Sequence, residues 1–260
     1  MPVIEQIHNH RSIRKYKSDP IPENLLKEIL EAGIRTSSSG NMQTYSIIVT
    51  QDQKLRSALL EPHMGQSMVV DAPVFLTFCA DFNRMRRWLN LSNAADNFDN
   101  FFSFMIAAID AILVSQTVAL AAESRGLGLC FLGSTLANAD QIGTLLQLPL
   151  NVVPVTGFSL GYPGEEPPLR DRLPFSSLVH WETYQEFTDR DIRDIYSERE
   201  NTGWQRYMKS KWLRAQVEEK GVQNLAQLYT EVKYTRDSHQ DFSRKLLTFL
   251  ADQGFMENED

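Results

Sequence analysis

The segment that most constrains the fold of this chain runs from Phe101 to Arg125. It is the longest stretch with helical periodicity, and apolar residues would occupy most of the circumference of that helix. Such a helix must be buried on nearly every side, so we expect it at the centre of the protein or in an interface between subunits. Its polar residues Asp110, Ser115 and Gln116 argue against a membrane span. Asp110 needs a partner, and a cap or a hydrogen bond from a neighbouring helix is favoured over a catalytic role.

The composition is that of a soluble globular protein. Of 260 residues, 42% are hydrophobic and 23% charged, which fits one large domain or one domain with an appendage. The net charge of −7 argues against a nucleic-acid partner. Cys79 and Cys130 each lie in an apolar run, which predicts buried thiols in a reducing compartment. With no basic-then-apolar leader visible, we expect a cytoplasmic protein without a membrane partner.

Periodicity predicts an α+β layout in which helices and strands surround the long helix. The near-continuous apolar run 73–80 predicts a strand covered on both faces. No G-x-G-x-x-G opens a helix after a strand, so a Rossmann fold is not supported, and the five histidines show no metal-ligand spacing. Helices are predicted over 3–7, 22–35, 51–60 and 138–148, strands over 45–50, 129–132 and 152–160, and a surface excursion over 83–100.

The first candidate functional segment is His10-Arg11-Ser12-Ile13-Arg14. Arginine presents a fixed fork of donors that matches a phosphate, and serine and histidine add further donors. A helical or turn conformation would place Arg11 and Arg14, three residues apart, on one side. This pattern predicts a site for a cofactor phosphate; a solvated basic turn is the alternative, and for this motif alone it is favoured.

Two polar loops are further candidates. Thr36–Gln43 has small side chains and a glycine, which allow backbone amides and hydroxyls to approach a flat polar ligand closely, although a plain linker has the same composition. Residues 167–174 form a proline-fenced loop in which Arg170 and Arg172 would face one side of an extended chain. That pair could support an anion or an electron-rich ring edge, or it could simply be solvated.

The C-terminal part, from Phe187 to Phe255, is predicted to be mostly helical and polar. Between Trp204 and Lys245 it carries nine Lys or Arg residues and five Asp or Glu residues, so it is basic within an acidic chain. Such a patch suggests a phosphate-bearing cosubstrate, with a solvated helical face as the alternative.

Three segments together resemble the FMN-dependent nitroreductase family: HRSIRKY at 10–16, SSSGNMQTYSII at 37–48 and LRDRLP at 169–174. The C-terminal extension makes the chain most similar to the larger, NADPH-linked branch of oxygen-insensitive nitroreductases and flavin reductases. The resemblance implies an FMN-binding core over 1–180 and a helical C-terminal extension over 181–260 that could bind the cosubstrate. It also implies a sandwich with a central, mostly antiparallel sheet flanked by helices, the long buried helix at a homodimer interface, and one FMN per subunit.

The resemblance also assigns roles to residues. His10, Arg11, Ser12 and Arg14 would hold the FMN phosphate and the pyrimidine side of the ring. The remaining positions would contact the flavin or the 2′-phosphate of NADPH. The flavin would be touched by Ser38, Ser39 and Asn41 from the neighbouring chain and by Gln66, which would contact the ring system. Under the face of the ring would lie Leu132, Gly133 and Ser134, and near N1/O2 and the phosphate would lie Arg170 and Arg172. The 2′-phosphate would be bound by Lys233, Arg236 and Arg206. The family often has lysine where this chain has Arg170.

The implied activity is ping-pong hydride transfer from NAD(P)H through FMN to a small-molecule acceptor: a nitroaromatic, a quinone or a flavin. No side chain is expected to be catalytic, because the FMN N5 atom carries the chemistry. NADPH is preferred over NADH because the C-terminal region is basic. The alternatives are a non-catalytic flavin-binding sensor on the same fold, and a relative that performs dehalogenation or flavin fragmentation.

Overall fold

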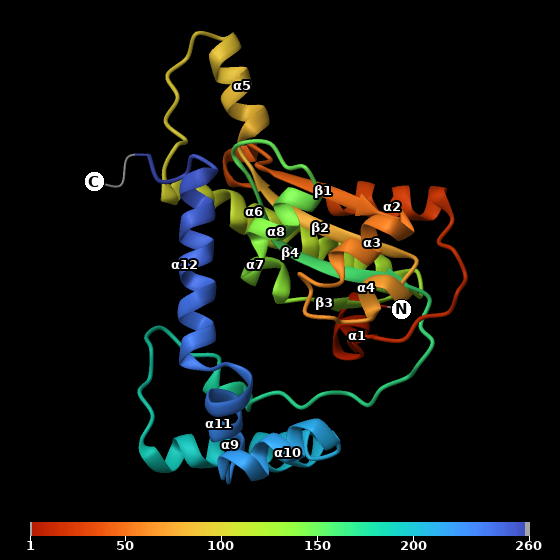
Figure 1. Cartoon of the computed structure of the whole chain (residues 1–260), viewed down its shortest axis with the longest axis vertical. Coiled ribbons are helices and arrows are strands. Elements are labelled where there is room, and N and C mark those ends of the chain that lie inside the picture. Colours follow the sequence, from red (N-terminus) through yellow and green to blue (C-terminus); the bar gives the residue numbers. More distant parts are fainter. Residues whose placement is uncertain (1, 258–260) are drawn as a thin grey trace. The chain divides into compact units, whose positions relative to one another are not determined.

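The computed structural model describes residues 2–257 and has an α+β fold built on one antiparallel sheet (Figure 1). The strand order is β1-β2-β4-β3, so β1 and β3 lie at the edges. The prediction of a mostly antiparallel sheet with flanking helices is confirmed. The strands are β1 (Tyr45–Thr50), β2 (Val74–Asp81), β3 (Gly128–Phe131) and β4 (Val152–Gly161).

Helices cover both faces of the sheet, as the apolar run of β2 predicts. All eight residues of β2 are buried. Its even-numbered residues from Val74 to Ala80 belong to the larger hydrophobic cluster, whereas Phe75 belongs to the other, because successive side chains point to opposite faces. The larger cluster is closed by α2 (Glu23–Gly33) and α6 (Phe101–Ser124), and the smaller by α3 (Gln53–Leu59), α4 (Met68–Asp71) and α8 (Ala139–Leu145).

The remaining helices in the first 150 residues of the chain are short. They are α1 (Val3–His8), η1 (Ser39–Asn41), α5 (Asn83–Leu91) and α7 (Ser134–Ala137). The sequence does not predict α4 and α7, because four residues give too little periodicity to recognise a helix. In β4, Pro154 coincides with a shift of register opposite Phe78 and Cys79, as expected where a strand residue lacks an N–H donor.

The long helix α6 is buried on one side only. Its Ala107, Ala111, Val114 and Val118 are fully buried, so it forms much of the larger core. Its other side exposes a stripe of large apolar residues with helical spacing: Phe102, Met105, Ile109, Ile112 and Leu113. Burial within the single chain thus accounts for one side of α6, and burial of the other side in an interface between subunits stays a prediction. By length and composition α6 could cross a membrane, but 50% of its most apolar window is buried inside the protein.

The chain divides into two compact units, one comprising residues up to Pro168 and from Phe242 onward, the other Leu169–Asp241. The second unit has its own small core around Val217, Val222 and Leu228. Thr188 begins α9 (Asp189–Tyr207) with a capping box, and Ser210 and Gly221 bound α10 (Lys211–Lys220). The helical character predicted for the C-terminal part is confirmed by these two helices and by four further elements: η2 (Phe175–Ser177), α11 (Leu225–Leu228), the π-helical turn η3 (Tyr229–Lys233) and α12 (Arg236–Asp252). The residues of α12 fall in both units.

Candidate functional site

The arginine-rich segment 10–14 is extended and lies along the edge strand β3. Ser12 pairs with Leu129 in a parallel bridge, and the Ile13 N–H donates to the Leu129 carbonyl at 2.8 Å. The expected helical or turn conformation is therefore wrong. The open edge of β3 satisfies the backbone of the segment, and in an extended chain residues three apart do not share a face.

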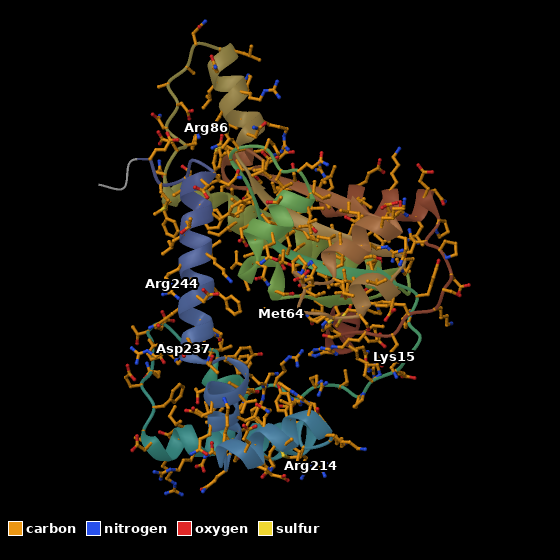
Figure 2. All side chains as sticks on the ribbon, viewed as in Figure 1. Lys15, Met64, Arg86, Arg214, Asp237 and Arg244 are labelled. Carbon is orange, nitrogen blue, oxygen red and sulfur yellow. The ribbon has the colours of Figure 1, made fainter. Side chains whose placement is uncertain are left out.

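Several contacts fix this segment in place. The Tyr16 hydroxyl lies 2.6 Å from the Ile13 carbonyl oxygen and 2.7 Å from Ser159 Oγ, and burial raises the pKa of Tyr16, so the hydroxyl remains protonated. A Cβ atom at Gly128 would lie 2.5 Å from Ile13 Cγ1, so glycine is needed for this close approach. The Glu165 carboxylate accepts the N–H groups of Arg14 and of Lys15, which is labelled in Figure 2, at 2.7 and 3.1 Å. The positions of Arg11 and Arg14 are thereby set by backbone contacts.

The two guanidinium groups of this segment have donors to spare. Among the described residues Arg11 Nε, which is buried, has no hydrogen-bond partner, and Arg11 Nη1 donates to the Asn9 carbonyl at 3.4 Å. Arg14 is exposed and donates to the Ser12 carbonyl at 3.3 Å. Within residues 2–257 neither arginine forms a salt bridge with a carboxylate, whereas His10 Nδ1 lies 2.5 Å from Glu123 Oε1. Each of these unneutralised guanidinium groups can bind an anion such as a phosphate, although the extended backbone does not itself place them on one face.

A second group of predicted residues meets beyond the end of β3. Gln66 Nε2 donates to Ser134 Oγ at 3.2 Å and to the His63 carbonyl at 3.0 Å. Leu132 is buried and its N–H donates to Gly157, whereas Gly133 is exposed, with open space where a Cβ atom would point. One strand therefore carries Ser12 along its edge and leads directly to Ser134.

The turn before Gln66 has an unusual backbone. Met64, labelled in Figure 2, has a φ of 58° and is followed by Gly65 with a φ of 67°. Positive φ is uncommon for a residue with a branched or long side chain and tends to occur at functional sites. Met64 is also exposed, so no packing of its side chain explains this conformation.

The serine-rich loop is held by a buried carboxylate. Asp110 is fully buried and accepts hydrogen bonds from Ser38 Oγ at 2.7 Å, the Ser39 N–H at 2.9 Å and Thr44 Oγ1 at 3.1 Å. The partners of Asp110 therefore lie in this loop, and one of them is the N–H of Ser39, the first residue of the short helix η1. Asn41 is exposed at a φ of 55°. Contacts of Ser38, Ser39 and Asn41 with a flavin remain a prediction.

A cavity of about 370 Å³ opens beside this loop and α5. Its lining includes Asn41, Trp88 and the Asp81–Arg84 pair. Arg84 Nη1 lies 2.9 Å from Asp81 Oδ2, and Arg84 Nη2 donates to the carbonyls of Gln43 and Tyr45, both at 2.9 Å. The sequence predicts only a surface excursion around Arg84, because nothing near it in the chain reveals its acceptors, which come from β1, β2 and the loop and also include Ser46 Oγ at 2.8 Å.

In the second unit, two of the three predicted cosubstrate residues converge on Tyr207. Lys233 Nζ lies 3.0 Å from the Tyr207 hydroxyl and 4.3 Å from its ring centroid, and Arg206 Cζ lies 5.0 Å from the same centroid. Burial opposes ionisation of Tyr207, but the hydrogen bond from Lys233 and the charge of Arg206 outweigh it, so the pKa of Tyr207 is lowered. Arg236 begins α12 on the surface and is not part of this cluster.

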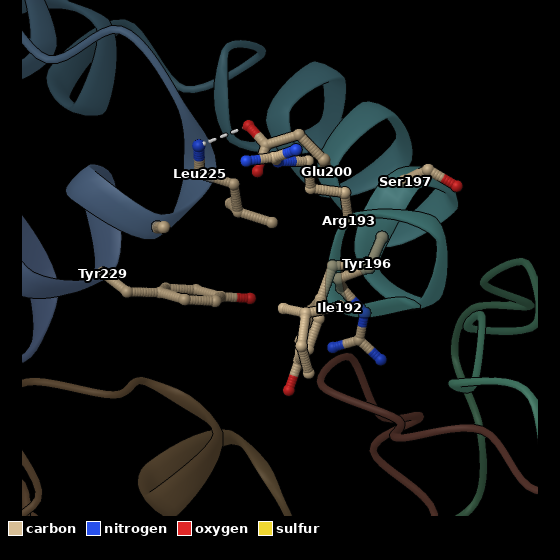
Figure 3. Close-up of a pocket in the computed structure, with 9 residues that line it drawn as sticks. Ile192, Arg193, Tyr196, Ser197, Glu200, Leu225 and Tyr229 are labelled. Carbon is tan, nitrogen blue, oxygen red and sulfur yellow. Dashed lines mark hydrogen bonds between the residues drawn. The ribbon is translucent and has the colours of Figure 1, made fainter. Parts of the chain in front are cut away.

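An apolar groove of about 480 Å³ adjoins this cluster between α9 and α11. Ile192, Tyr196, Leu225 and Tyr229 line it, and Glu200 accepts the Leu225 N–H at 2.6 Å, drawn as a dashed line in Figure 3. The Tyr229 ring is 6.1 Å from that of Tyr207, so aromatic and cationic surfaces adjoin within one unit.

The predicted loop arginines are exposed. Arg172 Nη1 donates to the carbonyls of Arg170 and Asp171 at 3.2 and 3.0 Å. The Asp171 carboxylate lies 2.6 Å from Arg199 Nε and 3.8 Å from Arg206 Nη1. Contacts of Arg170 and Arg172 with a flavin stay a prediction. In the part of the chain that the structure describes, no three His, Cys, Asp or Glu side chains gather as metal ligands do.

Comparisons with known proteins agree on one family. The sequence profile described as "Nitroreductase family" matches residues 7–162. An FMN reductase (NAD(P)H) from Bacillus subtilis is 37% identical over 184 residues, 70% of this chain and 74% of that protein. An oxygen-insensitive NADPH nitroreductase from Salmonella typhimurium is 37% identical over 185 residues, 71% of this chain and 75% of that protein.

Solved structures give the same result over nearly the whole chain. Nitroreductase A from Vibrio parahaemolyticus has a TM-score of 0.81 and 31% identity, with 98% of both chains covered. The NADPH:FMN oxidoreductase from Vibrio harveyi, complexed with NAD+, has a TM-score of 0.80 and 28% identity, with 98% of this chain and 99% of that chain covered.

Proposed function

Because this chain belongs to the nitroreductase family, we propose that it is an FMN-dependent NAD(P)H oxidoreductase. The observation that carries the proposal is the extended segment 10–14 on β3, which presents Arg11 and Arg14 without carboxylate partners in the described chain. Two unneutralised guanidinium groups on a fixed backbone suit the phosphate of FMN.

The proposed roles of the residues follow from their positions. Arg11 and Arg14 hold the phosphate, with His10 and Ser12 as further donors, and Gln66 and Ser134 contact the ring system beyond β3. When bound, FMN supplies the hydride and electron chemistry, so the chain needs no nucleophile or general base of its own. Arginines such as Arg170 or Arg172 near N1 would favour the negative charge of the reduced ring.

We propose that two chains form a homodimer through the exposed apolar side of α6. Phe102, Met105, Ile109 and Ile112 form a stripe too apolar to be left in water, and exposed apolar residues of this extent mark protein interfaces. The Ser38–Asn41 loop, fixed to the same helix through Asp110, would then reach the flavin held by the other subunit.

We propose NADPH as the preferred reductant and place its 2′-phosphate at Lys233 and Arg206. Their charges meet at Tyr207, and a phosphate there would gain charge-assisted hydrogen bonds. The acceptor would be a nitroaromatic, a quinone or a flavin. Two buried free thiols, Cys79 and Cys130, support a cytoplasmic location.

The test is direct. The purified protein should be yellow, or become yellow with added FMN, and should oxidise NADPH when a quinone or a nitrofuran is supplied. A protein that stays colourless after reconstitution would refute FMN binding. A yellow protein that turns over with neither NADPH nor NADH would instead be a flavin-binding sensor.

A further inference from the structure

A fully buried histidine beside the proposed flavin site has no role in the function described so far. His63 has no exposed surface, and its ring packs against Phe75 with centroids 4.8 Å apart. Nδ1 lies 3.0 Å from Ser134 Oγ, and within the described chain Nε2 has no hydrogen-bond partner. A polar ring kept in an apolar cluster needs a reason, because a hydrocarbon side chain would avoid the cost of the unpaired nitrogen.

The hydrogen-bond directions around Ser134 can be worked out from its neighbours. The His63 carbonyl oxygen only accepts, so the atom of Gln66 that lies 3.0 Å from it must be the amide nitrogen. That nitrogen also contacts Ser134 Oγ at 3.2 Å and therefore donates to it. The Ser134 hydroxyl proton then has two possible directions: toward His63 Nδ1 or away from both neighbours.

The tautomer of His63 decides between these directions. If Nε2 carried the proton, a buried N–H donor would be left unpaired, which is rarer in native proteins than an unpaired acceptor. If Nδ1 carries it, His63 and Gln66 both donate to Ser134 Oγ, and the hydroxyl proton of Ser134 is free to point elsewhere. Burial lowers the pKa of His63 to about 4, so the ring is neutral near pH 7 and such a tautomer exists there.

We propose that His63 is a positioning residue, which in its Nδ1–H form aims the Ser134 hydroxyl as a hydrogen-bond donor at an acceptor atom of the bound flavin. This inference rests on the proposed function, because it takes the ligand beyond β3 to be FMN. It explains why a histidine stands at this buried position, because a hydrocarbon side chain would leave Ser134 without the donor that Nδ1 supplies.

Three variants test the proposal. His63→Leu removes the donor to Ser134, His63→Asn places an amide nitrogen near the position of Nδ1, and Ser134→Ala removes the aimed hydroxyl. Loss of one hydrogen bond corresponds to roughly 3- to 10-fold weaker binding. We expect that loss of FMN affinity, with a shifted visible flavin spectrum, in His63→Leu and Ser134→Ala, and recovery of both in His63→Asn. If His63→Leu and Ser134→Ala keep the wild-type FMN affinity and spectrum, His63 serves packing alone and the proposal is wrong.

A measurement on the wild-type protein does not depend on how the variants fold. Nitrogen-15 NMR of the histidine side chains distinguishes the two tautomers, and we expect the proton of His63 on Nδ1. A proton on Nε2 would overturn the proposal, because Ser134 would then donate to His63. If the protein binds no FMN, the proposed function fails on that result, whereas a wrong tautomer in a yellow protein refutes only the role of His63.

Discussion

Ser38 and Asp110, 72 positions apart in the sequence, are joined by a hydrogen bond of 2.7 Å between Ser38 Oγ and Asp110 Oδ2. This bond ties the polar loop before β1 to the middle of the most apolar helix of the chain. Asp110 is fully buried and also accepts from Ser39 and Thr44. The conformation of a loop proposed to reach a flavin is thus set from within the core.

Replacing Asp110 should destabilise the protein strongly. In Asp110→Asn the new amide N–H group faces the donors of Ser38, Ser39 and Thr44, so at least one buried donor loses its acceptor. Each hydrogen bond to a charged group contributes about 1.5–3 kcal/mol. We expect the free energy of unfolding to fall by about 2–4 kcal/mol in urea denaturation followed by circular dichroism. The exposed Asp19→Asn is the matched control and should change it by less than about 0.5 kcal/mol. Equal effects of both would show that the loop does not depend on the buried charge.

The sequence predicts the strands and long helices because periodicity reports which faces are buried. For β2 a near-continuous apolar run predicts burial on both sides, and the two clusters divide its residues by alternation. Local spacing fails at the segment 10–14, since the edge of β3 that holds it extended lies more than 100 residues away in the chain. The same limit applies to Asp110, whose partners come from a distant loop.

The candidate site is predictable in residue type and not in its supporting contacts. The arginine-rich segment 10–14, the serine-rich loop and the arginine pair of the proline-fenced loop are predicted from residue type, and Gln66 from a resemblance. His63 gives no signal, because a lone histidine usually belongs to a core or a surface. Its contact with Ser134 depends on the approach of the turn after α3 to the end of β3. Such a contact is visible only once the chain is folded.

Removing Arg14 should weaken the binding of FMN. Arg14→Ala deletes a guanidinium that has no carboxylate partner in the described chain, so little of the fold depends on it. A hydrogen bond to a charged group contributes about 1.5–3 kcal/mol, which corresponds to a dissociation constant for FMN raised about 10- to 100-fold. Fluorescence titration of the apoprotein with FMN measures this change. The control is Arg190→Ala, whose side chain is 91% exposed in the second unit and should leave FMN affinity unaltered; unchanged binding in Arg14→Ala would contradict the phosphate site.

The stability of the protein should depend on the protonation of His63. Burial lowers its pKa to about 4 from 6.5, so as the pH falls the unfolded chain takes up the proton first. The contribution of His63 to the free energy of unfolding is therefore complete above about pH 6.5 and decreases by about 3 kcal/mol as the pH falls to about 4. Urea denaturation between pH 7 and 4 measures this slope. His63→Asn should reduce the slope, whereas the control His8→Asn, at an exposed position, should not. Identical slopes for the wild type and both variants would mean that His63 is not buried in its neutral form.

Substitutions around Tyr207 should separate NADPH from NADH. Lys233→Ala and Arg206→Ala each remove one cation from the cluster, and only NADPH carries a 2′-phosphate that would bind there. One lost charge-assisted hydrogen bond predicts a KM for NADPH that rises about 10-fold or more, with the KM for NADH changed by less than about twofold. Steady-state assays with one quinone and both reductants provide the comparison. Arg236→Ala is an internal reference. The resemblance implies the same role for Arg236, but Arg236 lies outside the cluster, so its effect should be smaller. A parallel rise in both constants would place the 2′-phosphate elsewhere and leave Lys233 and Arg206 with a structural role around Tyr207.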